Sequence, residues 1–468
     1  MISSCQTPEV ATFQPTPQSS DQVPEPAAQD TIVQDPATPG PNAQELGDLF
    51  EQAIVAGDIG QALEIYFLYL DAQDREGLDS SALRQVYPSL LLSAGHIEEA
   101  EEYLRSELKN NPRNIDVLYG LSLIASAEND RPQLESLYSQ MIEIDSEDSR
   151  ALTGLGMLAR TARQNSQARE FFRRALESDP QNLQALLARA DLLFSEGSLE
   201  AAAIDLSRAL VLDPNIDFAW ALRGRIRAAD GDLVGGLEDL DRAIEVNPYS
   251  PWNFVDRGRT ALRAGRVEQA AGDFSAAWEL DDSNFLTLVY RAQAYDSLGD
   301  SRAAAEDYRQ VLSMRPDYNP AYISAAVSFF QTRNYAEAQR YFVAGAQTQG
   351  ARPEYYLLAA LAGYYNDQRA ATNRSLSDWL SRIPQDSIFR AIGRYYTTPG
   401  NESTLLFQIQ RITDVTEKAQ AQVLLGAHIL LEGRTATALA LLSEMGEDVL
   451  RGLPEGAIAR WLTNEYIK

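Results

Sequence analysis

The sequence contains one cysteine and two histidines, and this scarcity excludes several kinds of chemistry. A single cysteine, Cys5, cannot form an intrachain disulfide. The usual zinc sites need several Cys or His ligands, which Cys5, His96 and His428 cannot supply because they lie far apart in the chain. A Walker loop, a nucleophile elbow and an HExxH motif are also absent from the sequence. We therefore expect a protein that is not an enzyme and that has no metal or other cofactor.

Long apolar runs and early basic residues are missing as well. No apolar run reaches the roughly 18 residues that a membrane-spanning helix needs. The net charge is −27, and residues 1–74 carry twelve acidic residues before the first basic one, Arg75. Such a field repels phosphate backbones and anionic lipid headgroups. We expect no nucleic-acid partner, and no membrane contact other than a lipid anchor.

Residues 1–42 are predicted to be a disordered tail rich in proline and glutamine. Eight prolines fall between Gln6 and Pro41, with few large apolar residues that could offset the entropy of ordering. Residues 2–5 (Ile-Ser-Ser-Cys) resemble the cleavage box of bacterial lipoproteins, which implies a lipidated Cys5 and a tether outside the cytoplasm. Neither a charged n-region nor an apolar h-region precedes Cys5, so an export signal would have to lie upstream of Met1. The alternative is an untethered tail on a cytoplasmic protein.

A period of 34 residues organises most of the remaining chain. Successive repeats can be numbered from 1 to 34 so that a recurrent proline falls at position 32, which makes Leu183 position 1 of its repeat. Apolar and small residues recur at positions 4, 8 and 11 and again at 20, 24 and 27, as expected for two amphipathic helices. Glycine recurs at position 15, where the first helix must end. A fixed period of this size predicts stacked repeats. The prolines are Pro112, Pro180, Pro214, Pro248 and Pro316.

This pattern resembles the tetratricopeptide repeat, and the resemblance covers most of residues 43–350. It implies an all-α fold, an α-solenoid of about 11–12 antiparallel helical hairpins. The regular array is predicted over residues 43–352. Beyond Gly350 the register degrades, and residues 353–468 are predicted to form degenerate hairpins followed by a closing helix at 455–466.

Arginine recurs at position 7 and aspartate at position 23 in four successive repeats. Where position 7 is Leu155 or Ala325, position 23 is aromatic instead. Both positions lie where the two helices of a repeat meet, so the sequence predicts a partly buried ion pair in each repeat. A row of catalytic or anion-binding arginines is the alternative, but it would not explain why the acid always accompanies the base. The predicted pairs are Arg189–Asp205, Arg223–Asp239, Arg257–Asp273 and Arg291–Asp307.

In tetratricopeptide arrays the first helix of each repeat lines a concave groove, chiefly through positions 2, 5, 9 and 12. The resemblance therefore implies a groove for a protein or extended peptide with aromatic or apolar anchors and some acidic character. The alternative is that Phe218 and Trp252 merely pack onto the preceding repeat. The residues projected into the groove, or beside it, are Phe218, Arg225, Trp252, Arg259, Arg263, Gln293 and Asp296.

Three functional hypotheses follow from these observations. The leading one is a protein-interaction scaffold, tethered to a membrane outside the cytoplasm through Cys5. The second is a cytoplasmic adaptor or regulator with the same groove and an untethered tail, and codons upstream of Met1 would separate the two. The third is an accessory region of an enzyme within residues 353–468, which no constellation of residues supports. The sequence predicts no oligomeric state.

Overall fold

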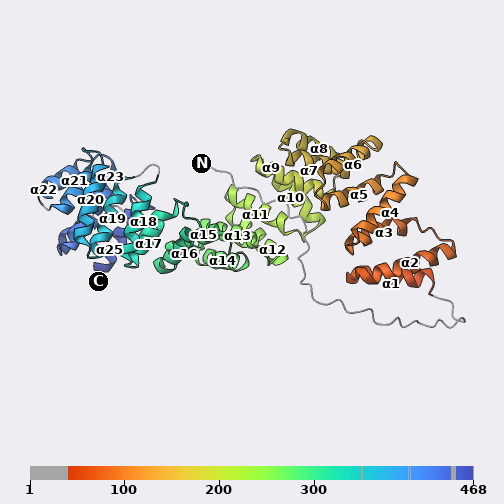
Figure 1. Ribbon diagram of the computed structural model, residues 1–468, viewed down its shortest axis with the longest axis horizontal. Coiled ribbons are helices and arrows are strands. Elements are labelled where there is room, and N and C mark those ends of the chain that lie inside the picture. Colours follow the sequence, from red (N-terminus) through yellow and green to blue (C-terminus); the bar gives the residue numbers. More distant parts are fainter. Residues whose placement is uncertain (1–40, 349–351, 399, 401, 444–448, 467–468) are drawn as a thin grey trace. The chain divides into compact units, whose positions relative to one another are not determined.

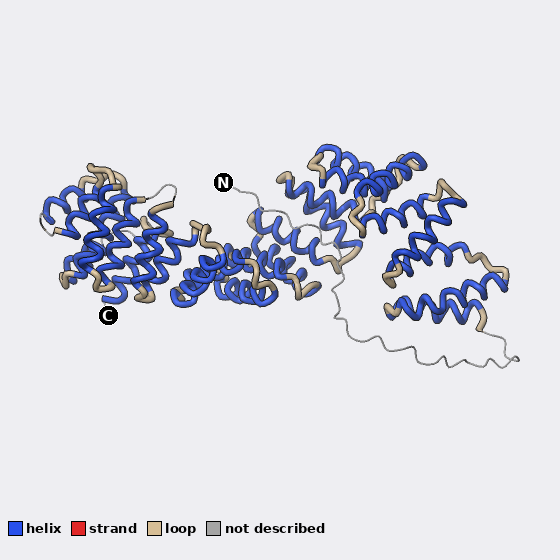
Figure 2. The backbone as a smooth tube through the Cα atoms, in the orientation of Figure 1, coloured by secondary structure: helices blue, strands red, loops and turns tan. Residues whose placement is uncertain are grey.

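The computed structural model describes residues 41–348, 352–398, 400, 402–443 and 449–466 (Figure 1). Every regular element in these residues is an α-helix, and Figure 2 shows no strand among them. The chain forms two compact units, which meet in the sequence between Leu212 and Asp213. Cys5 and nearly all of the predicted tail lie outside the described residues.

The first unit consists of five helical hairpins in its described part. Each hairpin pairs an odd-numbered helix with the even-numbered helix that follows it. The helices are α1 (Ala43–Ala56), α2 (Ile59–Glu76), α3 (Ser81–Ser93), α4 (Ile97–Asn110), α5 (Ile115–Ala127), α6 (Arg131–Ile144), α7 (Ser149–Thr161), α8 (Asn165–Ser178), α9 (Leu183–Ser195) and α10 (Leu199–Leu212).

The second unit contains seven further hairpins and one closing helix among its described residues. Together the two units confirm the prediction of an all-α repeat protein with about 11–12 hairpins. The helices are α11 (Asp217–Asp230), α12 (Leu233–Val246), α13 (Pro251–Arg263), α14 (Val267–Leu280), α15 (Phe285–Leu298), α16 (Ser301–Met314), α17 (Ala321–Gln331), α18 (Tyr335–Ala346), α19 (Pro353–Tyr365), α20 (Arg369–Ser381), α21 (Ile388–Thr397), α22 (Glu402–Gln410), α23 (Val415–Leu431), α24 (Thr435–Ser443) and α25 (Pro454–Tyr466).

Local sequence explains where the helices begin and end. The Asn182 side chain accepts a hydrogen bond from the Ala185 N–H at 2.9 Å and so caps the start of α9. At position 15, Gly231 ends α11 in the left-handed conformation with φ of 99°, as the recurring glycine predicts. Arg163 occupies the same position after α7 and also has a positive φ, 59°, so the turn survives without glycine.

Small residues let the two helices of a hairpin approach closely. In α8, Ala168, Phe172 and Ala175 are completely buried, at positions 20, 24 and 27 of their repeat. Gly156 in α7 faces them, and a Cβ atom at this position would lie 2.5 Å from the Phe172 ring. The close approach therefore depends on glycine at position 156, which has no Cβ atom.

The last helix folds back onto earlier helices of the second unit. The Gln331 side chain in α17 donates a hydrogen bond to the Ala457 carbonyl in α25 at 3.3 Å, and Figure 1 shows the two helices side by side. One hydrophobic cluster extends from Leu288 in α15 to Leu462 in α25. The predicted domain boundary between residues 352 and 353 stays a prediction, and both sides of it belong to this unit.

Candidate functional site

All four arginine–aspartate pairs form between the two helices of their hairpins. In each pair the guanidinium donates through Nε and Nη2 to both carboxylate oxygens. The aspartates are almost completely buried, whereas the arginines keep a small exposed fraction. Planar two-point pairing of this kind is both strong and geometrically selective. These arginines therefore hold helices together, and their guanidinium groups already have carboxylate partners.

The residues projected into the groove lie on the first helices of three successive hairpins, α11, α13 and α15. Phe218 begins this face on α11 with 42% of its surface exposed, and Trp252 follows on α13 with 52% exposed. Arg263 and Gln293 are also exposed, on α13 and α15 respectively. Solvent thus reaches both aromatic side chains. Their assignment to partner binding stays a prediction.

Two arginines of this face share one carboxylate. Arg225 Nε lies 3.7 Å from Asp256 Oδ2, and Arg259 Nη1 lies 3.8 Å from Asp256 Oδ1. Loss of hydration by burial raises the pKa of Asp256, and the two arginines oppose this shift. Arg259 also lies over the Tyr290 ring, 5.5 Å from its centroid, and about half of its side chain remains exposed. Arg259 is therefore held beside Asp256 and Tyr290 while part of its side chain remains open to solvent.

Asp296 holds helices together as well as lying on this face. Its carboxylate accepts hydrogen bonds from the Tyr308 hydroxyl at 2.8 Å and from the Ser328 hydroxyl at 3.0 Å, which links α15 to α16 and α17. Surrounding protein atoms reduce the hydration of this carboxylate and raise the pKa of Asp296 to about 6, although the two hydroxyl donors oppose the shift. Asp296 therefore links three helices as well as lying on the projected face.

A carboxyl group that the sequence pattern did not single out is buried at the start of α25. Glu455 is completely buried, and neither carboxylate oxygen has a hydrogen-bond partner among the described residues. Glu354 and Gln420 lie in the same region, and the Gln420 amide is 3.5 Å from the Glu354 carboxylate. An acid in the first turn of a helix is ordinary in a sequence. Its burial depends on which distant helices cover it, so no local pattern could have revealed it.

Two other kinds of site have no support in the described part of the chain. Its helices are all too short or too polar to cross a membrane. No group of three or more His, Cys, Asp or Glu side chains in these residues could hold a metal ion.

Comparison with known proteins identifies the repeats. The tetratricopeptide-repeat family model matches residues 153–215, 255–317 and 289–356, where the paired helices and their small residues have just been described. The chain is a tetratricopeptide-repeat protein. The resemblance predicted from the 34-residue period is thereby confirmed.

One curated relative of this tetratricopeptide-repeat protein is the tetratricopeptide repeat and J domain-containing co-chaperone DNJ1 of Fusarium oxysporum. The two are 42% identical over 53 residues, which are 11% of this chain and 10% of the relative. The chain therefore matches only about a tenth of the length of that co-chaperone.

Three solved structures are similar to parts of this chain at low sequence identity. Pseudomonas aeruginosa PilF is 18% identical, with a TM-score of 0.41 over 47% of this chain and 96% of that one. A tetratricopeptide-repeat protein from Parabacteroides merdae is 18% identical, with a TM-score of 0.38 over 53% and 98% of the two chains. YrrB, described as having an unusual peptide-binding site, is 20% identical, with a TM-score of 0.35 over 40% and 95%.

Proposed function

We propose that this protein is an interaction scaffold whose second unit binds an extended segment of a partner protein across α11, α13 and α15. The exposure of Trp252 carries the proposal. A large aromatic ring left in water on a repeat face is the kind of residue that dominates binding energy when a partner covers it. Phe218 offers a second aromatic anchor on the neighbouring first helix.

The charge of this face favours a partner with carboxylates. Arg259 and Arg263 are exposed on α13, on a chain whose net charge is −27. Arginines beside an aromatic anchor attract an acidic segment and disfavour a basic one. The proposed ligand is therefore an extended segment with aromatic or apolar side chains and acidic residues between them.

A crosslinking pull-down tests this assignment. Trp252→Ala/Arg259→Ala should capture far less of the partners that the wild-type protein retains, because the variant loses an aromatic anchor and an adjacent charge. The matched control is Phe407→Ala/Arg411→Ala. Phe407 lies on α22 and is 58% exposed, and Arg411, directly after this helix, lies 5.6 Å from the ring centroid. Equal capture by both variants and the wild type would exclude the α11–α15 face.

We further propose that Cys5 is lipidated and that the tail tethers the repeats to a membrane outside the cytoplasm. The support is the run of small residues before Cys5 and the proline-rich composition after it. Labelling cells with a clickable fatty acid should mark the wild-type protein and not Cys5→Ser. Equal labelling, or recovery of both proteins in the cytosol, would instead support the untethered adaptor.

A further inference from the structure

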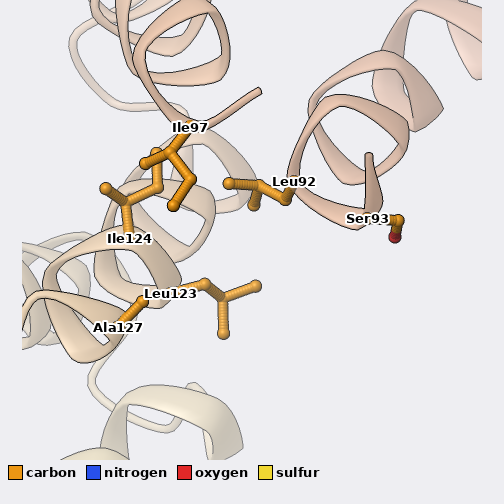
Figure 3. A pocket seen from close by; sticks show the side chains of 6 residues that line it. All are labelled: Leu92, Ser93, Ile97, Leu123, Ile124 and Ala127. Atoms are coloured by element: carbon orange, nitrogen blue, oxygen red, sulfur yellow. The ribbon is translucent and has the colours of Figure 1, made fainter. Parts of the chain in front are cut away.

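The first unit contains an apolar pocket of about 310 Å³. It lies where the end of α3, the start of α4 and the end of α5 come together, and Figure 3 shows the aliphatic side chains of these helices turned toward one opening. The volume is at the lower end of the range for ligand pockets. Its lining residues are Leu92, Ser93, Ile97, Leu123, Ile124 and Ala127.

The aliphatic side chains of this pocket are only partly covered. Ile124 is buried, whereas Ile97 and Leu123 keep 38% and 43% of their surface exposed. Apolar side chains exposed together mark an interaction site more often than single exposed ones do. The pocket has room for one large apolar side chain of a partner.

The helices that form this pocket belong to a strongly acidic part of the chain. Glu98 directly follows Ile97, Glu128 directly follows Ala127, and both are exposed. Neither forms an ion pair with any described residue. Residues 41–130, which include all three helices at the pocket, contain 17 acidic and five basic residues. An apolar opening within so acidic a segment is complementary to an apolar side chain flanked by cations.

We propose that this pocket is a second docking site, for a cationic amphipathic segment of another protein. One apolar side chain of the segment enters between Leu92, Ile97 and Leu123, and flanking Lys or Arg side chains pair with Glu98 and Glu128. An amphipathic helix presents such residues on one face. A second copy of this chain, with net charge −27, is disfavoured by repulsion, as are anionic lipid and nucleic acid. The occupant therefore has the opposite charge to that proposed for the α11–α15 face.

A synthetic leucine–lysine amphipathic helix of about 18 residues, fluorescently labelled, is the probe. Fluorescence anisotropy should show binding to the full chain that weakens with salt, because unscreened charges contribute. Leu123→Asp should weaken binding by about tenfold or more, since it places a carboxylate where the probe buries an apolar side chain. Glu98→Gln/Glu128→Gln should weaken it severalfold and reduce the salt dependence.

Three controls make the result decisive. Leu49→Asp changes a leucine of similar exposure, 45%, on α1 and should bind the probe as the wild type does. A leucine–glutamate helix of the same pattern should bind far more weakly than the leucine–lysine helix. Trp252→Ala/Arg259→Ala should leave binding of the leucine–lysine helix intact. The proposal is overturned if Leu123→Asp binds normally, if the leucine–glutamate helix binds equally well, or if the Trp252 variant loses the probe.

Discussion

Arg291 donates two hydrogen bonds to Asp307, with an Nε–Oδ2 distance of 2.8 Å and an Nη2–Oδ1 distance of 2.7 Å. The two residues lie 16 positions apart on the two helices of one hairpin, and three neighbouring hairpins repeat the arrangement. Hydrogen bonding to Asp307 raises the pKa of Arg291, so the guanidinium stays charged. The pair therefore behaves as one buried unit in which neither charge can be removed cheaply.

Asp307→Ala should lower the free energy of unfolding by roughly 2–4 kcal/mol, because Arg291 then lies between two helices without its carboxylate. Replacing both partners, as Arg291→Met/Asp307→Leu, should cost less than Asp307→Ala alone. Urea unfolding followed by circular dichroism measures both. Glu245→Ala, which removes one partner of the exposed Arg242–Glu245 pair, should change stability by less than about 0.5 kcal/mol. A double variant less stable than Asp307→Ala would contradict the buried-unit interpretation.

Gly156→Ala should destabilise the first unit by about 1–3 kcal/mol, because the new Cβ would overlap the Phe172 ring in a packed core. Other hairpins show how the overlap can be relieved. Ala190 occupies the equivalent position in α9, and its partner across the hairpin is Leu206 rather than phenylalanine. We therefore expect Phe172→Leu to cost less in the Gly156→Ala background than in the wild type. A double-mutant cycle of thermal unfolding measures this coupling, and additive effects would argue against the contact.

Glu455→Gln should stabilise the protein at mildly alkaline pH. Burial, with a smaller contribution from Glu354, raises the pKa of Glu455 to about 7 from a usual value of 4.5. The folded state thus binds the Glu455 proton more tightly than the unfolded state does. The contribution of Glu455 to the free energy of unfolding is therefore most favourable below about pH 4.5 and falls as the pH rises to about 7. Glutamine cannot ionise and avoids this loss.

At about pH 8 the Glu455→Gln variant should exceed the wild type by about 1–3 kcal/mol, and near pH 4.5 the two should be similar. Urea unfolding at both pH values gives the difference directly. Glu465→Gln, also on α25 but in an exposed ion pair with Arg333, is the control and should show no comparable pH-dependent gain. A Glu455→Gln effect independent of pH would mean that the side chain matters for its shape alone.

His428 should produce a pH dependence of opposite sign. Its ring is 99% covered, stacks on Tyr396 at 4.2 Å and has no hydrogen-bond partner for either nitrogen among the described residues. Burial, with a smaller contribution from Arg369, lowers the pKa of His428 to about 4 from 6.5. The unfolded state then binds the proton more tightly, so stability is present above pH 6.5 and is lost as the pH falls toward 4.

His428→Phe keeps an aromatic ring in this position and removes the titration. Between pH 6.5 and about 4.5 the wild type should lose about 1–3 kcal/mol more stability than this variant does. Unfolding by urea across this range measures the difference. His96→Gln is the control, because His96 is exposed at the start of α4 and should leave the acid sensitivity unchanged. Equal acid sensitivity of wild type and His428→Phe would place the responsible group elsewhere.

The hairpins could be predicted because the residues that determine each of them lie close together in the sequence. Gly231 ends α11 where the period placed a helix stop. The Arg291–Asp307 pair could also be inferred, since two residues 16 apart in a hairpin meet whenever both helices form. In each case the relevant partner lies within one repeat, so a repeating sequence contains the information.

Longer-range contacts could not be inferred in this way. Gln331 and Ala457 are 126 residues apart, and nothing in either segment indicates that α25 returns to α17. The burial of Glu455, the exposure of Trp252 and the pocket beside Leu123 all depend on which helix covers which surface. A 34-residue period specifies neighbouring contacts because each helix packs first against the next one along the chain. Which surfaces remain open, and which ionisable groups lose their water, follows only when distant helices have packed.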